Sequence, residues 1–410
     1  MLYSIGFFIF SLLYLPTLIF KGKLHADFGE RFAIFDKMKE RALLSGRDRI
    51  WIQAVSVGEV ALCKSFIPVL KEKFPDRDIV ISTITKAGND LARKIFGKDV
   101  VIIYFPLDFK AIVRKTISLI KPALYIMIET EIWPNLLAEL SSRAISSALI
   151  NGRISDRSIG KYRFAKPFLK KTLESINIFC MQDSIDAERI IELGAPKERV
   201  RITGNMKFDI ELPANVKDIE AVRDLFGLKA GEELFVAGST REGEEEIVLD
   251  VFNRLLADFP NLRLLIAPRH IDRAVQIDKL IQTLTPDSKS RIILLDTIGH
   301  LNEAYSVATI VFVGGSLIKH GGHNPIEPAY FAKPILFGLN MFNFKYIAAV
   351  FLRNKAALQV FNGEDLYEKC KLLLRDAAAR GLLGKNAKKT IVENAGATGK
   401  NVIEIAGVLK

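Results

Sequence analysis

The sequence has few of the cysteines that form disulfides in small folds or bind metal ions. Its three cysteines, Cys63, Cys180 and Cys370, are odd in number and far apart, which argues against a disulfide framework or a zinc site and indicates a reducing compartment. It has no low-complexity stretch or short repeat, as in an ordinary globular protein. Neither G-x-G-x-x-G nor G-x-x-x-x-G-K-S/T occurs, which argues against a dinucleotide dehydrogenase and a P-loop enzyme.

What the chain has is length and an excess of positive charge. Its 410 residues exceed what one hydrophobic core usually supports, so two domains are expected. The net charge of +11 favours an anionic partner, whether nucleic acid, a membrane surface or a phosphorylated substrate. Aromatic and basic residues are not interleaved as in single-strand platforms, so no nucleic acid is expected as a partner.

Residues 2–20 contain no charged side chain and begin without the basic residues of a signal peptide. A helix of this length spans roughly the hydrocarbon core of a bilayer. We therefore predict a membrane anchor over residues 1–22; a buried core helix is the alternative, and Pro16 also suits an interfacial segment. The basic residues that follow place the rest of the chain on the cytoplasmic side: Lys21, Lys23, Arg31, Lys37, Lys39 and Arg41.

Short apolar runs then alternate with helix-length amphipathic stretches. Strands are predicted at 50–55, 78–84, 100–105, 123–128, 144–150 and 176–182 and, after a polar stretch, at 233–239, 262–268, 291–296, 309–315 and 334–338. This alternation predicts two doubly wound, Rossmann-like α/β domains, over 23–213 and 214–410, facing each other across a cleft. Ligands bind such sheets beyond the carboxyl ends of the strands, so residues there are the site candidates.

Acidic residues follow two strands of the first half. Glu59, in the segment SVGE, lies in the first turn of a predicted helix. There it is either an acid that complements the helix dipole or a general base at a ligand site. Glu129 and Glu131, with Trp133, follow the strand at 123–128, where a hydrogen-bonded helix start is the structural alternative.

The second half offers groups for a phosphate. Gly238-Ser239-Thr240 leads into a helix N-terminus with backbone N–H groups, although the glutamates that follow also suit helix capping. Arg269 ends the next strand with a guanidinium suited to bidentate phosphate binding. Lys207, where the halves join, is placed to reach the same anion.

The segment 313–328, VGGSLIKHGGHNPIEP, is the richest in glycine, histidine and capping residues. Its Gly314-Gly315-Ser316 turn suits an anion. Asn324 at the N-cap, Pro325 at N1 and Glu327 at N3 form a helix start, which capping alone explains. Paired glycines around this helix start also suit a nucleotide, with ribose hydroxyls on Glu327. A metal on His320 and His323 lacks a third ligand at a suitable spacing, so no metal is expected.

Together these segments resemble one family, the transferases of 3-deoxy-D-manno-octulosonic acid (Kdo), which add Kdo to lipid A precursor in Gram-negative bacteria. Between residues 51 and 344 the matching segments follow the order WIQAVSVGEV, IETEIWPN, NGRISDRS, GNMKFD, GSTREGEEE, APRH and VGGSLIKHGGHNPIEPA, then MFNF. The resemblance implies the GT-B glycosyltransferase fold, with an acceptor-binding first domain and a CMP-sugar-binding second domain. It also implies CMP-Kdo as donor, lipid IVA as acceptor, inversion at the anomeric carbon, no metal or other cofactor, and the cell inner membrane as location.

The resemblance also assigns roles to individual residues. Glu59 is similar to the family's proton acceptor, and Glu129 and Lys207 to its transition-state stabilisers. The residues implied to bind CMP are Pro268, Arg269, Ile298, Gly299, His300, Asn324, Pro325, Ile326 and Glu327. The chain departs from the family's common residues at three places, namely Gln53, Arg241-Glu242 and Leu339-Asn340.

Two other functions remain as alternatives. One is a transferase of the same fold that uses a UDP-sugar, and the other is a membrane-tethered scaffold with an inactive nucleotide fold. The presence of Glu59, Lys207, Arg269 and Glu327 together argues against the scaffold. A basic run between Arg153 and Lys171, with Tyr162, Phe164 and Phe168, is interpreted either as a solvated helix face or as a surface that meets anionic lipid.

Overall fold

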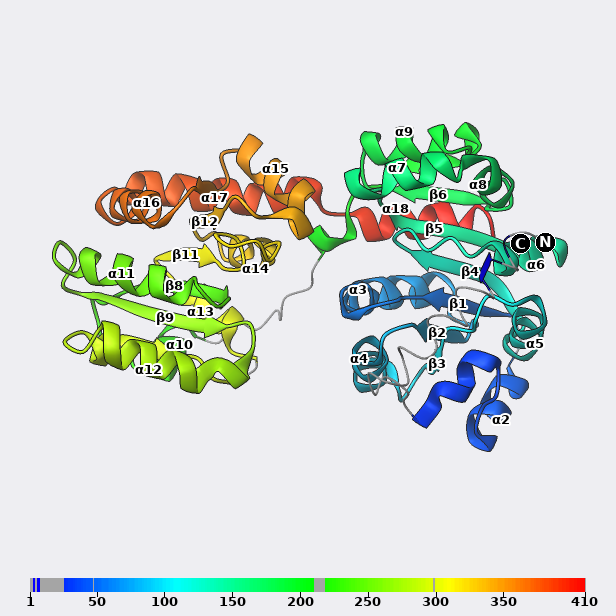
Figure 1. The fold of residues 1–410 in the computed structure, drawn as a ribbon, viewed down its shortest axis with the longest axis horizontal. Coiled ribbons are helices and arrows are strands. Elements are labelled where there is room, and N and C mark those ends of the chain that lie inside the picture. The colour runs from blue at the N-terminus through cyan, green and yellow to red at the C-terminus, as the bar shows by residue number, and fades with distance from the viewer. Residues whose placement is uncertain are drawn as a thin grey trace. The chain divides into compact units, whose positions relative to one another are not determined.

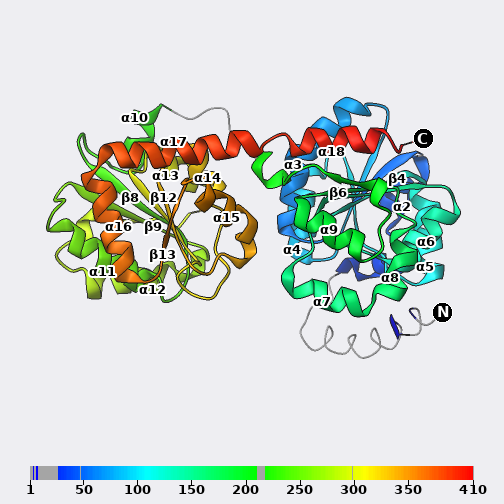
Figure 2. The ribbon, with the colours of Figure 1, turned by 90° about the horizontal axis from the view of Figure 1, so that it is seen from above.

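The computed structural model describes residues 3, 6, 7, 26–46, 48–209, 218–297 and 299–409. The chain divides into two compact units, residues 1–210 with 395–410 (unit 1) and residues 211–394 (unit 2). Each unit has a parallel sheet with helices on both faces, as predicted (Figures 1 and 2).

Unit 1 contains a seven-stranded sheet in the order β3-β2-β1-β4-β5-β6-β7, with all neighbouring strands parallel. Strands β1 to β6 are buried on both faces, which explains their largely apolar sequences, whereas the edge strand β7 is partly exposed. They are β1 (Arg49–Gln53), β2 (Ile79–Thr83), β3 (Val101–Tyr104), β4 (Pro122–Ile128), β5 (Ser146–Gly152), β6 (Ile178–Met181) and β7 (Val200–Ile202).

Successive residues of each strand face opposite layers of helices. In β1, Ile50 and Ile52 join the core beneath α3 (Val57–Lys73), α4 (Lys86–Phe96) and α18 (Ala397–Ala406). Trp51 points into the opposite core. The helices on that face are α2 (Lys37–Ser45), α5 (Lys110–Ile120), α6 (Pro134–Ser142), α7 (Asp156–Phe164), α8 (Lys166–Leu173) and α9 (Ser184–Glu192). Short 3₁₀ helices complete the unit: η1 (Ala26–Phe32), η2 (Lys197–Arg199) and η3 (Met206–Asp209).

Unit 2 contains a six-stranded parallel sheet in the order β10-β9-β8-β11-β12-β13. The strands are β8 (Glu233–Thr240), β9 (Leu262–Pro268), β10 (Ile292–Leu294), β11 (Ile310–Val313), β12 (Ile335–Gly338) and β13 (Leu358–Val360). One core packs them against α11 (Glu245–Leu256), α12 (Ala274–Leu284) and α16 (Gly363–Arg375). The other helices are α10 (Ile219–Leu225), α13 (Leu301–Val307), α14 (Ile326–Tyr330), α15 (Lys345–Arg353) and α17 (Ala377–Asn394), with η4 (Ile271–Arg273), η5 (Lys289–Arg291) and η6 (Phe342–Phe344).

The predicted strands all occur, with ends shifted by a few residues, but the edge strands β7 and β13 were not predicted. Each has three residues, so it carries too few apolar positions to stand out in the sequence. Helix α14 begins at Ile326, one residue later than predicted; the Asn324 side chain still accepts a hydrogen bond from its first N–H, at 3.1 Å.

The expected C-terminal domain of 214–410 differs from the structure at its end, because residues 395–410 belong to unit 1. Helix α18 lies beside α3 (Figure 2) and buries Ala397, Val402 and Ile405 in the core of unit 1. The carboxylate of Asp209 accepts hydrogen bonds from the N–H groups of Gly396, at 2.6 Å, and Thr398. Both the apolar burial and this cap fix α18 on unit 1.

The anchor predicted over residues 1–22 lies outside the described residues except for Tyr3, Gly6 and Phe7. Among the residues that the structure describes, no helix combines the length and apolarity needed to cross a membrane.

Candidate active site

Both sheets have a point where the order of strands reverses, between β1 and β4 in unit 1 and between β8 and β11 in unit 2. Doubly wound sheets bind ligands beyond the carboxyl ends of their strands at this switch point. Glu59 and Glu129 follow β1 and β4, whereas Arg241 follows β8. The candidate residues of each unit therefore lie where the topology places a ligand.

Glu59 is a half-buried carboxylate in the first turn of α3. It accepts a hydrogen bond from the N–H of Val55 and, at 3.3 Å, one from the Ser56 hydroxyl. Burial raises the pKa of Glu59 to about 8, and the charges of Glu129 and Glu131 act in the same direction. A carboxylate with so high a pKa is a stronger base than an ordinary glutamate, as general-base catalysis near neutral pH requires.

The segment after β4 holds the other two carboxylates. Glu129 has a φ of 59°, a left-handed conformation that costs a residue with a Cβ about 1–2 kcal/mol. Glu131 accepts a hydrogen bond from the Trp133 indole N–H at 3.0 Å. Burial raises the pKa of Glu131 to about 7; this hydrogen bond opposes the shift and the charge of Glu129 adds to it. The strain and the crowding of like charges are both typical of a functional site.

Lys207 lies beside this acidic cluster, with its Nζ 3.6 Å from Glu129 Oε1. Buried amides from three consecutive strand ends hold its backbone. Asn205 accepts from the Lys207 N–H at 2.9 Å and donates to Gln182 at 2.8 Å. Asn151 accepts from the N–H of Met206 at 3.0 Å. The ammonium group is thus held against carboxylates that need a counter-charge.

In unit 2 the predicted anion-binding turns are already occupied by a side chain. The carboxylate of Glu244 is fully buried and accepts four backbone N–H groups at 2.5–3.0 Å, those of Arg241, Gly315, Ser316 and Leu317. The N–H groups of Gly315 and Ser316, predicted for a ligand, therefore bind Glu244. This contact could not be predicted locally, because about seventy residues separate its partners.

Arginine and histidine side chains instead lie at the carboxyl ends of β8, β9 and β11. Arg269 and His270 follow Pro268, the last residue of β9, and both are exposed. His323 lies against Gly315, where a Cβ would come within 3.0 Å of the imidazole. Burial lowers the pKa of His323 to about 4, and the charges of Arg269 and Arg241 lower it further. This end of unit 2 is therefore suited to an anionic ligand.

The remaining predicted CMP-binding residues lie near the same edge of the sheet. The Asn324 side chain donates to Glu327 Oε1 at 3.3 Å, and Pro325 precedes α14, which Ile326 begins. Burial raises the pKa of Glu327, whereas Asn324 and Arg269 oppose the shift. Gly299 has a φ of 110° and His300 precedes α13, while Ile298 lies outside the described residues.

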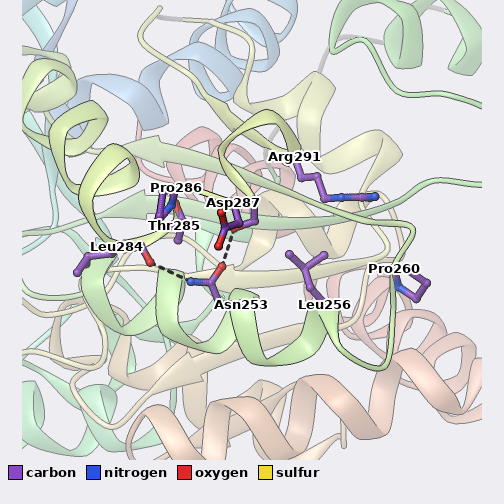
Figure 3. Close-up of a pocket in the computed structure, with 9 residues that line it drawn as sticks. Asn253, Leu256, Pro260, Leu284, Thr285, Pro286, Asp287 and Arg291 are labelled. Carbon is purple, nitrogen blue, oxygen red and sulfur yellow. Dashed lines mark hydrogen bonds between the residues drawn. The ribbon is translucent and has the colours of Figure 1, made fainter.

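A separate pocket of about 390 Å³ lies at the opposite edge of the unit 2 sheet, before β9 and β10 (Figure 3). Asn253 on α11 reaches across it, donating to the Leu284 carbonyl at 3.1 Å and accepting from the Ser288 hydroxyl at 2.6 Å. None of the predicted site residues lines it. Its lining residues are Asn253, Leu256, Pro260, Leu284, Thr285, Pro286, Asp287, Ser288 and Arg291.

Comparison with known proteins connects this geometry to a family. The family model for 3-deoxy-D-manno-octulosonic-acid transferase matches residues 26–210. A 3-deoxy-D-manno-octulosonic acid transferase of Haemophilus influenzae is 35% identical over 361 residues, which cover 85% of this chain and 84% of that protein. The chain belongs to the Kdo transferase family. Its membership confirms the resemblance recognised in the sequence and indicates a glycosyltransferase.

Two further likenesses extend over most of this Kdo transferase. A bifunctional glycosyltransferase/methyltransferase of Fusobacterium nucleatum is 41% identical over 78% of the chain and 52% of its own length. The crystal structure of a glycosyltransferase from Rickettsia africae is 12% identical, with a TM-score of 0.61, over 89% of this chain and 98% of that one. The second likeness shows the fold alone.

Sequence reasoning missed several residues that organise the site. Asn151, Gln182 and Asn205 support Lys207, and Glu244 closes the turn at 315–317. A signal was present for Asn151, which follows a predicted strand, and for Gln182, which lies at the end of one; Asn205 follows β7, which was not predicted. Among the described residues no group of three or more His, Cys, Asp or Glu side chains is arranged to hold a metal ion.

Proposed function

We propose that this Kdo transferase moves Kdo from CMP-Kdo to lipid A precursor, lipid IVA, with inversion and without a metal ion. The observation that carries the proposal is the cluster of Glu59, Glu129 and Lys207 at the switch point of unit 1. In a member of this family, a base of raised pKa beside a paired carboxylate and ammonium suits transfer of an acidic sugar to a hydroxyl.

Unit 1 supplies the base for the acceptor. The acceptor hydroxyl gives its proton to the carboxylate of Glu59 as its oxygen forms the new bond to the anomeric carbon. On the opposite side of that carbon, the bond to the phosphate oxygen of CMP breaks, and its electron pair leaves with CMP. The resulting inversion needs no covalent enzyme intermediate. Glu129 and Lys207 stabilise the charges that develop in the transition state.

Unit 2 supplies groups for the departing nucleotide. Arg269 offers a guanidinium that forms no ion pair with a carboxylate among the described residues, so its donors are available to the CMP phosphate. Asn324 and Glu327, which hydrogen-bond to each other at 3.3 Å, offer polar atoms for ribose hydroxyls. Charge that accumulates on the phosphate during bond breaking is stabilised by the arginine.

We further propose that the protein is held at the inner membrane by residues 1–22, with both units on the cytoplasmic side. Phe7 lies against Phe109 and Trp133, with ring centroids 5.1 and 6.4 Å apart, so Phe7 lies next to the segment that carries Glu131. On α7 and α8, Phe164 and Phe168 are 91% and 65% exposed among basic residues. Both features suit a surface at which a lipid acceptor enters.

The test is mass spectrometry of lipid IVA incubated with the purified protein and CMP-Kdo. We expect the acceptor to gain the mass of one or more Kdo residues, in EDTA as well as in magnesium. UDP-sugars in place of CMP-Kdo serve as the comparison. Transfer only from a UDP-sugar refutes CMP-Kdo as the donor. Activity that EDTA abolishes and magnesium restores refutes the metal-independent mechanism.

A further inference from the structure

Two arginines and three histidines of unit 2 lie at three adjacent strand ends. Arg241 follows β8, Arg269 and His270 follow β9, and His320 and His323 follow β11, and β9, β8 and β11 are neighbours in the sheet. All of the other four act electrostatically on His323, so they lie close together. Within the described residues, neither arginine forms an ion pair with a carboxylate. The fold thus holds two guanidinium groups at one edge of the sheet, neither in a salt bridge with a described carboxylate.

Arg241 is held in place independently of Arg269. Its backbone N–H donates to the buried carboxylate of Glu244 at 3.0 Å, and its Nη1 lies 2.7 Å from His270 Nε2. A guanidinium can only donate, so His270 Nε2 accepts this hydrogen bond. The Arg241 Nε is buried and has no partner among the described atoms.

The proposed donor carries two negative groups on the same carbon atom. Kdo is a 2-keto acid, so its anomeric carbon bears a carboxylate as well as the phosphate oxygen of CMP. A second arginine would give each of these two negative groups a guanidinium of its own. Arg269 accounts for the phosphate, which leaves the carboxylate without a cation.

We propose that Arg241, oriented by His270, binds the carboxylate of the donor sugar. The assignment rests on the proposed function, because it needs a donor whose sugar is a 2-keto acid. The carboxylate stays charged from the ground state to the transition state. Arg241 therefore binds both states alike and acts on the KM for the donor rather than on kcat.

The test is Arg241→Gln, which keeps most of the side chain and removes its charge. We expect the KM for CMP-Kdo to rise ~10- to 100-fold, as for loss of a charged hydrogen bond, with kcat nearly unchanged. Inhibition by CMP, which lacks the carboxylate, should stay within about twofold, since Arg269 remains. Arg353→Gln, an exposed arginine at the end of α15, makes the same change in net charge and should leave every constant unchanged.

A loss of CMP affinity as large as the rise in donor KM assigns Arg241 to the phosphate and overturns the inference. An unchanged donor KM overturns it as well. If the wild-type protein neither binds CMP nor uses CMP-Kdo, the proposed function itself is wrong and the inference falls with it. Activity of the wild-type protein with CMP-Kdo therefore distinguishes a failure of the Arg241 inference from a failure of the proposed function.

His270 is a positioning residue in this scheme, and a double variant tests that role. His270→Ala should raise the donor KM less than Arg241→Gln does. The double variant should match Arg241→Gln alone, because His270 acts only through Arg241. A further rise in the double variant shows that His270 binds the donor itself, which contradicts its positioning role.

Discussion

Replacement of Glu59 by glutamine tests the base and the electrostatics of unit 1 together. The amide keeps one oxygen, which can still accept from the Val55 N–H, while its NH2 group replaces the oxygen that accepts from the Ser56 hydroxyl. The amide cannot take a proton from the acceptor. Transfer should fall ~10²- to 10⁴-fold, while CMP affinity stays within a few-fold. A variant that retains a tenth of the activity refutes the role of Glu59 as the general base.

The raised pKa of Glu59 also predicts a pH profile. The base works only when deprotonated, so kcat/KM of the wild-type protein should rise with pH and level off above about 8. Measuring transfer from CMP-Kdo at a series of pH values gives this profile. A rate that is already constant from pH 5 upwards contradicts the raised pKa.

The same substitution should stabilise the fold. Between pH 4.5 and about 8 the folded protein binds the Glu59 proton more tightly than the unfolded chain does, so stability falls as pH rises through this interval. One pKa unit corresponds to about 1.4 kcal/mol, and solvent screening reduces the total. Removing the charge should therefore raise the free energy of unfolding at pH 8 by roughly 1–3 kcal/mol.

Denaturant unfolding of the wild-type protein and the Glu59→Gln variant at pH 5 and pH 8 measures this effect. The gain should be larger at pH 8 than at pH 5, because only at the higher pH is the wild-type carboxylate forced to carry its charge. Glu72→Gln, an exposed glutamate of the same helix, is the matched control and should change neither activity nor stability. A variant less stable than the wild type at pH 8 refutes the electrostatic reasoning.

Three further predictions concern the nucleotide, the membrane surface and the C-terminal helix. Arg269→Ala should weaken CMP binding ~10-fold or more, and equal affinity by calorimetry contradicts its contact with the phosphate. Reversal of Lys161, Lys166 and Lys170 to glutamate should raise the KM for the lipid and leave that for CMP-Kdo unchanged, whereas a rise in the donor KM places the basic run on the nucleotide side. Asp209→Ala removes the acceptor for the first N–H groups of α18 and should lower the free energy of unfolding by about 1–2 kcal/mol, measured by denaturant titration.

Much of the architecture was predictable because a buried parallel strand is a continuous apolar run. All eleven predicted strands occur, and the two that were missed have three residues each at the sheet edges. The candidate residues Glu59, Glu129 and Arg269 were also recognisable, since each is polar and directly follows a strand or its turn. That position is a local property of the chain.

Contacts between distant segments could not be read in this way. The turn at 314–316 looked free for an anion, yet Glu244 binds its amides. Residues 395–410 looked like the end of the second domain, yet α18 packs on α3 in unit 1. In each case the partner lies far away along the chain, and its sequence neighbours give no reason to prefer one partner over another.

The sequence by itself therefore determined the fold class, the family and the strand-end position of the proposed catalytic groups. These depend on hydrophobic periodicity and on short motifs, which are local. Only the tertiary structure decided that Glu129 adopts a left-handed conformation beside Lys207, and that Glu59 is buried near two other carboxylates. Burial and the approach of like charges set the pKa of Glu59, and both arise only when strands and helices from distant parts of the chain pack together.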